Sequence, residues 1–290
     1  MALYAIGDVH GCARTLDALL IAIAGDVDAY DRRALGPDDT FVFVGDYVDR
    51  GPDSPGVLDR ILAFEAAAAA GRGPRVVILR GNHDQMMLDY ATGVGDTELW
   101  WVNGGRATLH AYESRGDLVI PEPHVGLLRR SGLTFDAEGT VFVHAGLDPN
   151  QTIAENLAHP DAAVALWTRA HLHADLSLWE RPVVCGHTPA PEPGDAPRLI
   201  RIDTGAVYHD RPGLGRLTAV RMPERRFVQV AYCGSPDDDA PPCSSRRRHD
   251  GRRVSGRGAG SPGRPRRACV CRRRHRKRPR GRYHGHVAHR

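Results

Sequence analysis

Five short segments of the chain carry metal-binding or proton-transferring side chains directly after a run of apolar residues. The segments are Gly-Asp-Val-His-Gly (7–11), Gly-Asp-Tyr-Val-Asp-Arg-Gly (45–51), Gly-Asn-His-Asp (81–84), Val-His-Ala-Gly (143–146) and Cys-Gly-His-Thr (185–188). Their donor groups are the carboxylates, imidazoles and amide oxygen of Asp8, His10, Asp46, Asn82, His83, His144 and His187. Such a set, without thiolate, suits hard or borderline divalent cations such as manganese, iron or zinc.

The number of these groups indicates two cations rather than one. Even six of these seven groups exceed the four ligands of a tetrahedral site, whereas two ions about 3.5–4 Å apart that share one carboxylate would use six. Such a pair stabilises both the attacking and the leaving oxygen of an in-line displacement. Taken singly, each segment also fits a tight turn with a capping Asp or a structural His. Five turns that all end in ligand groups favour the metal site.

The apolar pattern predicts the elements that position these groups. Short apolar runs at 3–6, 40–44 and 75–79 are typical of buried strands. The following helices are indicated by apolar spacing at 16–23, by Ser54 and Pro55 before an Ala-rich run to Ala70, and by the pattern from about Gln85. Because β-α-β crossovers are right-handed, the three segments after these strands should lie at one edge of one sheet.

The second half of the chain predicts a different arrangement. Short strands are expected at 140–143, 182–184, 199–202, 217–220 and 227–231, separated by Gly, Pro and Asp. This pattern predicts a second, more antiparallel sheet that packs face to face with the first, with helices outside and the site at the strand ends. The region from about 85 to 135 is helical in pattern.

The segments 7–11, 45–51 and 81–84 resemble, in order and spacing, the signature blocks of the phosphoprotein phosphatase (PPP) family of metallophosphoesterases. Other segments resemble its bacterial and bacteriophage serine/threonine protein phosphatases: Gln85-Met86-Met87, Asn103-Gly104-Gly105, His144-Ala145-Gly146, Leu166-Trp167-Thr168-Arg169, Gly186-His187-Thr188-Pro189 and Ile202-Asp203-Thr204-Gly205-Ala206. The similarity covers residues 1–234. It implies an α/β metallo-dependent phosphatase fold, with two mixed β-sheets packed face to face and flanked by helices.

The resemblance also implies a binuclear metal centre. Asp8, His10 and Asp46 would hold the first ion, and Asp46, Asn82, His144 and His187 the second, with Asp46 bridging. Two divalent cations are expected as cofactors, manganese first and iron or zinc as alternatives. The implied nucleophile is a metal-bridging water, and no covalent phosphoenzyme is expected.

Four further residues receive catalytic roles from the resemblance. Arg50 and Arg169 would grip the phosphoryl oxygens, because a planar guanidinium donates two parallel hydrogen bonds. His83 would act as general acid to the leaving alkoxide, and Asp49 would orient it and stabilise its protonated form.

The implied activity is hydrolysis of phosphomonoesters, with a serine/threonine phosphoprotein or phosphopeptide as substrate. One departure from the family pattern is Asp84, where protein phosphatases usually have Glu. Aspartate at this position is familiar from symmetrical dinucleoside tetraphosphate (Ap4A) hydrolases, which are the alternative. Asp49 in Val-Asp-Arg and Thr188 after His187 match the protein phosphatases instead.

The charge of the chain divides it into two parts. Residues 235–290 contain 18 of the 39 Lys and Arg but only 4 of the 35 Asp and Glu, so this part carries +14 and residues 1–234 carry −10. With Tyr283 as its single aromatic residue, the basic part is predicted to be a disordered tail after a catalytic domain at 1–234. Three interpretations stay open: a nucleic-acid-binding arm with non-specific polyanion contact, a strand lying on the acidic domain, or the product of a shifted reading frame.

A hypothesis from another class makes the folded domain an inactive platform for a nucleic-acid-binding tail; the complete set of catalytic residues argues against it. No run of eighteen apolar residues and no secretory signal is evident, so a cytoplasmic location without membrane contact is expected.

Several other residues have less specific interpretations. Cys12 and Cys185 are predicted to be small buried hydrophobes, Cys269 and Cys271 with His275 are not expected to bind zinc, and Arg80 is predicted to be a solvated charge. Trp100 and Trp101 fit either helix-end packing before a glycine cap or the lining of a substrate groove.

Overall fold

The structure is a computed structural model, and it describes residues 1–234. The predicted disordered tail, including Cys269, Cys271 and His275, lies outside the described residues.

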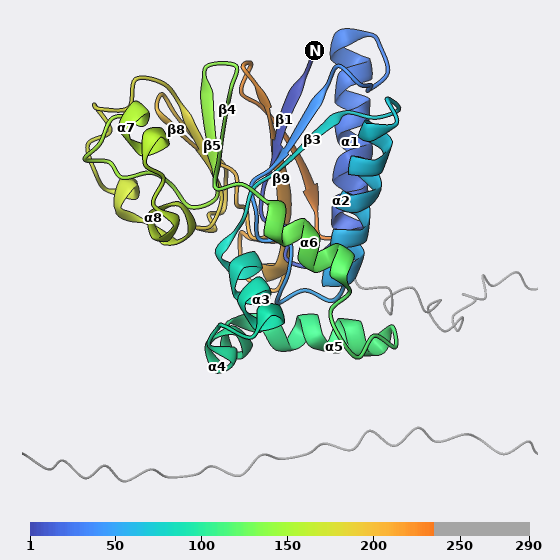
Figure 1. The fold of residues 1–290 in the computed structure, drawn as a ribbon. Helices are drawn as coiled ribbons and strands as arrows, with labels where there is room; N and C mark the ends of the chain where they lie inside the picture. Colours follow the sequence, from blue (N-terminus) through green and yellow to red (C-terminus); the bar gives the residue numbers. More distant parts are fainter. Residues whose placement is uncertain (235–290) are drawn as a thin grey trace, which may run out of the picture. The chain divides into compact units, whose positions relative to one another are not determined.

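The first of two sheets holds the three parallel strands predicted from the N-terminal half. Its order is β10-β9-β1-β2-β3, with β1 Leu3–Ile6, β2 Thr40–Phe43, β3 Arg75–Ile78, β9 Arg216–Met222 and β10 Arg226–Ala231. The strands β1, β2 and β3 run parallel, whereas β9 pairs antiparallel with β1 and β10 with β9. The crossover helices α1 Ala13–Asp31 and α2 Ser54–Ala69 cover its outer face (Figure 1).

The second sheet is mixed rather than mainly antiparallel. Its order is β4-β5-β6-β8-β7, with β4 Thr134–Ala137, β5 Thr140–Val143, β6 Val183–Cys185, β7 Gly194–Ala196 and β8 Leu199–Arg201. The pairs β5–β6 and β6–β8 are parallel, and the edge pairs β4–β5 and β7–β8 are antiparallel. The prediction that 217–220 and 227–231 belong to this sheet is wrong, because both strands extend the first sheet. The short edge strands β4 and β7 were not predicted.

Alternation along the strands explains how the two sheets pack. Leu3 and Ala5 of β1 point into an apolar cluster shared with Phe142 of β5 and Val184 of β6, so the sheets pack face to face. Tyr4 of the same strand points to the opposite side, into the cluster formed with α1 and α2. A third cluster lies between the second sheet and the helices α7 Ile153–Ala158 and α8 Ala162–Trp167. The predicted two-sheet architecture flanked by helices is therefore confirmed.

The region predicted to be helical forms a group of short helices near the strand ends of the first sheet (Figure 1). These are α3 Asn82–Thr92, α4 Thr97–Trp100, η1 Trp101–Gly105, which is kinked at Gly104 with a φ of 119°, α5 Arg106–Ser114 and α6 Glu122–Arg130. Single 3-10 turns occur later at η2 Ala170–Leu172 and η3 Ala206–Tyr208. No helix among residues 1–234 is long and apolar enough to cross a membrane.

The helix α3 begins at Asn82, three residues before the predicted start at about Gln85. The carboxylate of Asp84 accepts a hydrogen bond from the N–H of Gly81, the residue that precedes the helix, at 2.8 Å. An acidic side chain at the third helical position stabilises a helix start in this way. Asn82 and His83 therefore project from the first turn of a helix rather than from a loop.

Candidate active site and metal centre

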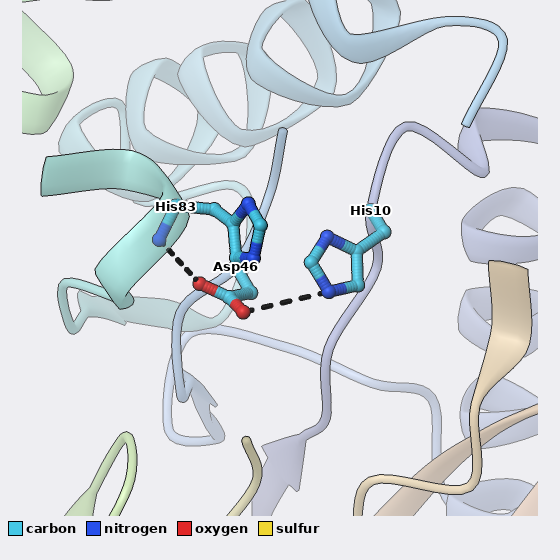
Figure 2. A group of neighbouring side chains, drawn as sticks. All are labelled: His10, Asp46 and His83. Atoms are coloured by element: carbon cyan, nitrogen blue, oxygen red, sulfur yellow. Dashed lines mark hydrogen bonds and ion pairs between the residues drawn. The ribbon is translucent and has the colours of Figure 1, made fainter. Parts of the chain in front are cut away.

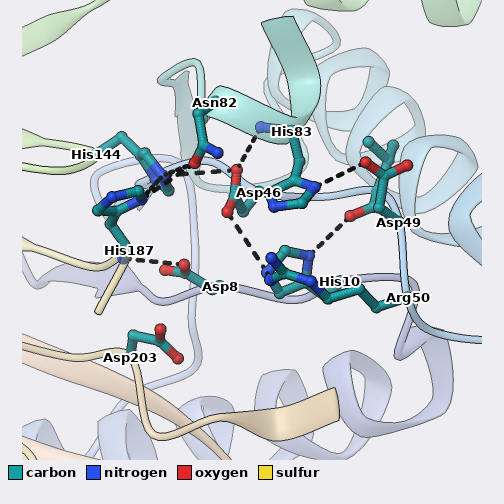
Figure 3. Close-up of polar contacts among 12 residues, drawn as sticks. Asp8, His10, Asp46, Asp49, Arg50, Asn82, His83, His144, His187 and Asp203 are labelled. Atoms are coloured by element: carbon teal, nitrogen blue, oxygen red, sulfur yellow. Dashed lines mark hydrogen bonds and ion pairs between the residues drawn. The ribbon is translucent and has the colours of Figure 1, made fainter. Parts of the chain in front are cut away.

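The predicted ligands lie at the carboxyl ends of strands from both sheets. Asp8 and His10 follow β1, Asp46 follows β2, Asn82 and His83 begin α3 after β3, His144 follows β5 and His187 follows β6. Figure 3 shows these side chains converging on one place, although the segments are separated by up to 179 residues in the sequence. All of them are buried.

Asp46 lies between two groups of possible ligand atoms. Its Oδ2 is 3.4 Å from His10 Nε2, and its Oδ1 is 3.5 Å from His144 Nε2. Asp46 forms one group with His10 and His83 (Figure 2), and a second with His144 and His187; within each group the ligand atoms lie within 4.8 Å of one another. A carboxylate that presents one oxygen to each group has the arrangement predicted for a bridging ligand.

Asn82 lies beside the second group, where its Oδ1 and two ring nitrogens are close together. Asn82 Oδ1 is 3.0 Å from both His144 Nε2 and His187 Nδ1, and these two nitrogens are 3.2 Å apart. His144 Nδ1 donates to the carbonyl of Val44 at 3.2 Å, so a neutral His144 directs the lone pair of Nε2 at Asn82 and His187. With Nδ1 of His187 also unprotonated, all three atoms would present lone pairs to a cation bound among them.

The imidazoles of the site are held in the form that binds metal. Burial lowers the pKa of His10 and of His187 to about 3, and also lowers the pKa of His144. The Nδ1 of His10 donates to the carbonyl of Val48 at 2.8 Å, which leaves its Nε2 unprotonated and facing Asp46. Neutral imidazole is the metal-binding species.

The carboxylates of the site also fit a cation. Burial raises the pKa of Asp8, and the negative charges of Asp203 and Asp46 raise it further. For Asp46 burial also favours the protonated form, but His144, His83 and His10 outweigh it and the pKa is lowered. Asp8 Oδ1 is buried without a hydrogen-bond partner, which is costly for a carboxylate unless a positive charge compensates it.

The residues present therefore fit two divalent cations, with one difference from the expected grouping. The group around His10 and Asp46 contains His83 and does not contain Asp8. The carboxylate of Asp8 instead accepts a hydrogen bond from the backbone N–H of His187 at 2.9 Å. A role for Asp8 in the first metal site stays a prediction.

The predicted proton donor and its partner form a buried pair. His83 Nδ1 is 2.7 Å from Asp49 Oδ2, and both side chains are almost completely excluded from solvent. The backbone N–H of His83 also donates to Asp46 Oδ1 at 3.0 Å, which ties the pair to the metal-binding groups. Burial raises the pKa of Asp49, and hydrogen bonds from His83, Thr108 and Trp100 oppose that rise.

The two predicted phosphate-binding arginines differ in their surroundings. Arg50 is partly buried, and its Nη1 lies 2.6 Å from His10 Nε2. Arg169 is exposed just before η2, where its charge adds to burial and to His144 in lowering the pKa of His187. Arg50 is thus in place at the candidate metal centre, whereas Arg169 is linked to it through the effect of its charge on His187.

Several site residues have a strained backbone. Among residues 1–234, eight non-glycine residues have positive φ, and five of them are predicted site residues: His10, Asp46, Asp49, Arg50 and His187. This conformation is uncommon for residues with a side chain, and it persists where surrounding contacts fix it. Here the N–H groups of Val9 and His10 both donate to the carbonyl of Asp46, at 3.1 and 2.9 Å. The loops after β1 and β2 therefore hold each other.

Two residues outside the predicted set border the site. Asp203 follows β8 and is buried near Asp8 (Figure 3); its Oδ1 accepts from Gly205 N–H at 2.9 Å, and burial raises its pKa to about 7. Like the predicted carboxylate ligands, Asp203 closely follows a buried strand. The same reasoning from the sequence would therefore have included Asp203 among the candidate ligands. Trp100 is fully buried and donates to Asp49, so the packing alternative holds for Trp100.

The remaining predictions concern two cysteines and Arg80. Cys12 and Cys185 are buried in apolar clusters, and burial raises the pKa of each thiol to about 12, as expected for inert cysteines. The prediction for Arg80 is wrong: its guanidinium donates to Ser131 Oγ, to Gln85 Oε1 and to the carbonyl of Arg129. Arg80 joins α3 to the end of α6, a structural task.

Comparison with known proteins identifies relatives that carry different names. A model of the family described as calcineurin-like phosphoesterase matches residues 1–206. The asymmetrical bis(5'-nucleosyl)-tetraphosphatase PrpE of Oceanobacillus iheyensis is 28% identical over 250 residues, which cover 78% of this chain and 90% of that protein. Serine/threonine-protein phosphatase 1 of Salmonella typhimurium is 29% identical over 231 residues, which cover 76% of this chain and 91% of that protein.

The fold also matches solved structures. A protein serine/threonine phosphatase from Saccharomyces cerevisiae with similarity to human phosphatase PP5 superimposes with a TM-score of 0.52 at 16% identity, and the match covers 82% of each chain. At this identity the likeness concerns the fold alone. Since the two curated relatives are almost equally similar, overall identity does not distinguish between their substrates.

Proposed function

Because the chain belongs to the calcineurin-like phosphoesterase family, and is therefore a hydrolase of phosphoesters, we propose that it removes phosphate from serine and threonine phosphoproteins. The observation that carries this proposal is the buried His83–Asp49 pair, with Nδ1 and Oδ2 2.7 Å apart. Asp49 fixes the ring so that the other nitrogen, Nε2, is available to hold the proton that the leaving group needs.

The proton donor favours a poor leaving group. A serine or threonine alkoxide is strongly basic and leaves slowly unless it is protonated as the bond to phosphorus breaks. The nucleotide that leaves a dinucleoside tetraphosphate departs through a phosphate oxygen, which is far less basic. General acid catalysis is worth about 10²–10⁴ in rate where it is needed, so a dedicated, buried acid pair supports the phosphomonoester substrate.

The remaining site residues have complementary tasks. Six side chains would hold two divalent cations, manganese being the metal we expect: Asp8, His10, Asp46, Asn82, His144 and His187. When bound, such ions supply positive charge to the phosphoryl group and make water a better nucleophile near neutral pH. Arg50 and Arg169 bind and orient the phosphoryl oxygens by charge-assisted hydrogen bonds.

A dinucleoside tetraphosphatase is the second candidate. The Oceanobacillus iheyensis relative is named for that activity, in its asymmetrical form. In addition, a cavity of about 530 Å³ adjoins Arg50 and is lined among others by His110, Arg115 and Tyr232. Its volume is within the usual range for small-molecule sites of roughly 300–1,000 Å³, and its cationic side chains would suit a polyphosphate.

The test compares the two substrates on the same preparation. A phosphoserine peptide and diadenosine tetraphosphate are offered at equal concentration to metal-stripped protein and to protein reconstituted with Mn²⁺. We expect turnover only after reconstitution, with the peptide preferred by about 10-fold or more. The His83→Asn variant should lose about 10²-fold or more on the peptide and much less on the dinucleotide. Faster turnover of the dinucleotide, together with a peptide rate that is insensitive to His83→Asn, would show the second candidate to be right.

A further inference from the structure

Asp49 is the centre of a buried hydrogen-bond network that reaches beyond His83. The indole Nε1 of Trp100 donates to both carboxylate oxygens, at 3.0 and 2.9 Å. The hydroxyl of Thr108 donates to Oδ1 at 2.8 Å. Asp49, Trp100 and Thr108 are all fully buried. The carboxylate that holds the His83 ring is therefore itself held by the side chains of Trp100 and Thr108.

The backbone of Asp49 is fixed by the same neighbours. Its N–H is 2.9 Å from Thr108 Oγ1 and 3.1 Å from Ser54 Oγ, and the two hydroxyl oxygens are 3.0 Å apart. Asp49 has a φ of 72°, a conformation that needs such support in a residue with a side chain. Side chain and backbone of Asp49 are thus restrained together.

The segment that supplies these donors, residues 100–108, also contacts Arg50. The carbonyl of Gly104 accepts the N–H of Arg50 at 3.2 Å, and a Cβ at Gly104 would lie 2.7 Å from Arg50 Cγ. A Cβ at Gly105 would lie 2.5 Å from ring atoms of Trp100, so a side chain there would displace the indole. Both glycines allow a contact that a larger residue would prevent.

We propose that Trp100 and Thr108 are positioning residues for phosphate-ester cleavage, which act by fixing Asp49 and through it the proton donor His83. The inference rests on the proposed function, since it assigns a purpose to the His83–Asp49 pair. Two donors on a buried carboxylate hold its orientation and its negative charge, and both are required for a fixed, protonated imidazole.

The step that depends on this positioning is the departure of the alcohol. The bond between phosphorus and the ester oxygen breaks, and its electron pair goes to that oxygen. The oxygen takes the proton from His83 Nε2 and leaves as the neutral alcohol. Water supplies the oxygen that replaces it on phosphorus; one of the water's protons stays on the phosphate product and the other restores the protonated His83. Asp49 stays ionised throughout and keeps its hydrogen bond to Nδ1. If the His83 ring were tilted, proton transfer would lag behind cleavage of the bond to phosphorus. The rate of cleavage would then fall most for the most basic leaving oxygens.

The test removes each donor: Thr108→Val keeps the side-chain volume, and Trp100→Phe keeps an aromatic ring at a buried position. Thr108→Val and Trp100→Phe are compared with wild type on a phosphoserine peptide and on 4-nitrophenyl phosphate, whose leaving group needs no proton. A hydrogen bond to a charged acceptor is strong enough that we expect each variant to lower kcat on the peptide by about 10-fold. KM, and the rate on 4-nitrophenyl phosphate, should change by less than about 3-fold.

The neighbouring tryptophan provides a matched control. Trp101 carries the same side chain, but its indole nitrogen has no hydrogen-bond partner in the described part of the chain. Trp101→Phe should therefore keep the wild-type ratio between the two substrates. An equal loss on both substrates in Trp100→Phe or Thr108→Val would indicate a general structural defect and overturn the proposal.

A double-variant cycle separates this inference from the proposed function. In a His83→Asn background, Thr108→Val and Trp100→Phe should have no further effect on the peptide, because the group they position is gone. Additive losses would overturn the positioning role while leaving His83 as proton donor. A His83→Asn variant with the wild-type rate on the peptide would instead overturn the proposed function. As a readout besides rate, the Nδ1–H proton resonance of His83 should shift in both single variants and stay in place in Trp101→Phe.

Discussion

Asp84 lies next to His83 in the sequence, but its side chain serves the backbone rather than the candidate site. Its carboxylate accepts hydrogen bonds from the N–H groups of Asp46, Tyr47 and Gly81, at 2.7, 2.9 and 2.8 Å. It thereby joins the start of α3 to the loop after β2. The aspartate that departs from the protein phosphatase pattern has no contact through which it would recognise a substrate.

We therefore predict that Asp84→Glu does not alter substrate preference. The ratio of kcat/KM for diadenosine tetraphosphate to that for a phosphoserine peptide should stay within about 3-fold of the wild-type ratio. The longer side chain must be accommodated in a fully buried place, so denaturant unfolding should show a loss of about 1–3 kcal/mol. If the variant does not fold, Asp84→Asn answers the same question, since it keeps the volume. A shift of the ratio by more than about 10-fold towards the peptide would contradict this account of Asp84.

At the residue scale, the sequence located the candidate ligands, because most of them follow a buried apolar run, and the structure brings them together at one place. His144 and His187 were identified in this way, and the structure brings them within 3.2 Å of each other. The positive φ values of His10, Asp46 and Asp49 could not be predicted, because nothing in the neighbouring sequence indicates them. They arise from hydrogen bonds between the loops after β1 and β2, which are contacts between distant parts of the chain.

At the element scale, periodicity located the strands but not their partners. The strand β9 was expected near 217–220, yet its membership of the first sheet depends on antiparallel pairing with β1, from Leu3 opposite Met222 to Ile6 opposite Ala219. Apolar alternation shows that a strand is buried and does not show which edge it joins. Short edge strands such as β7, Gly194–Ala196, lack even that signal, since they are mostly exposed.

The element η2 anchors the chain after α8 to the second sheet through one buried histidine. The ring of His171 stacks on Trp179 with 6.0 Å between ring centroids, and it lies close to the backbone of Gly146. Burial lowers the pKa of His171 to about 4. The residue is 2% exposed, and the positive charge of Arg201 adds to burial in keeping the pKa of His171 low.

This burial predicts a contribution to acid sensitivity. In the unfolded chain a histidine has a pKa of about 6.5, so between pH 6.5 and 4 the unfolded state binds a proton that the folded state does not. Stability supported by neutral His171 is therefore complete above pH 6.5 and is lost as pH falls towards 4, by up to about 3 kcal/mol.

The difference in unfolding free energy between wild type and His171→Phe, measured by urea titration, should change by that amount across the window, because phenylalanine keeps a flat ring without a titrating group. His159→Leu, at an exposed position after α7, controls for the loss of a histidine as such. A His171→Phe curve that runs parallel to wild type from pH 6.5 to 4 would contradict the assignment.

At the scale of the whole molecule, the site exists only where the two sheets meet. The first sheet supplies Asp8, His10 and Asp46, and the second supplies His144 and His187. The apolar cluster between the sheets contains Ala5 of β1 and Val184 of β6, close to the ends from which these ligands project. Face-to-face packing was predicted from the sequence and is what allows residues so far apart along the chain to meet. Its precise register depends on side-chain packing across the interface, which a one-dimensional pattern does not record.

The acidic and basic parts of the chain should have different properties. The described residues contain all three apolar clusters and every residue to which we assign a catalytic or metal-binding role. Residues 235–290 carry +14 against −10 for the rest. Phosphoester hydrolysis should therefore reside in residues 1–234, and attraction to polyanions in the basic part. These two properties should be separable by cutting between them.

A chain that ends at Gly234 should hydrolyse 4-nitrophenyl phosphate within about 2-fold of the full-length rate. Binding of single-stranded RNA to the full-length chain should weaken steeply with salt, because each neutralised phosphate releases counterions and contributes about −0.7 to the slope of log K against log salt. The shortened chain should show neither the affinity nor the slope. A full-length variant with Arg272, Arg273 and Arg274 changed to Gln keeps the length and should have an intermediate slope, which attributes the effect to charge. If RNA binding survives in the shortened chain, the binding surface belongs to the folded domain. If hydrolysis is absent from both chains while RNA binding follows the tail, the domain is a platform for the tail, and the catalytic assignment of His83 and its partners is wrong.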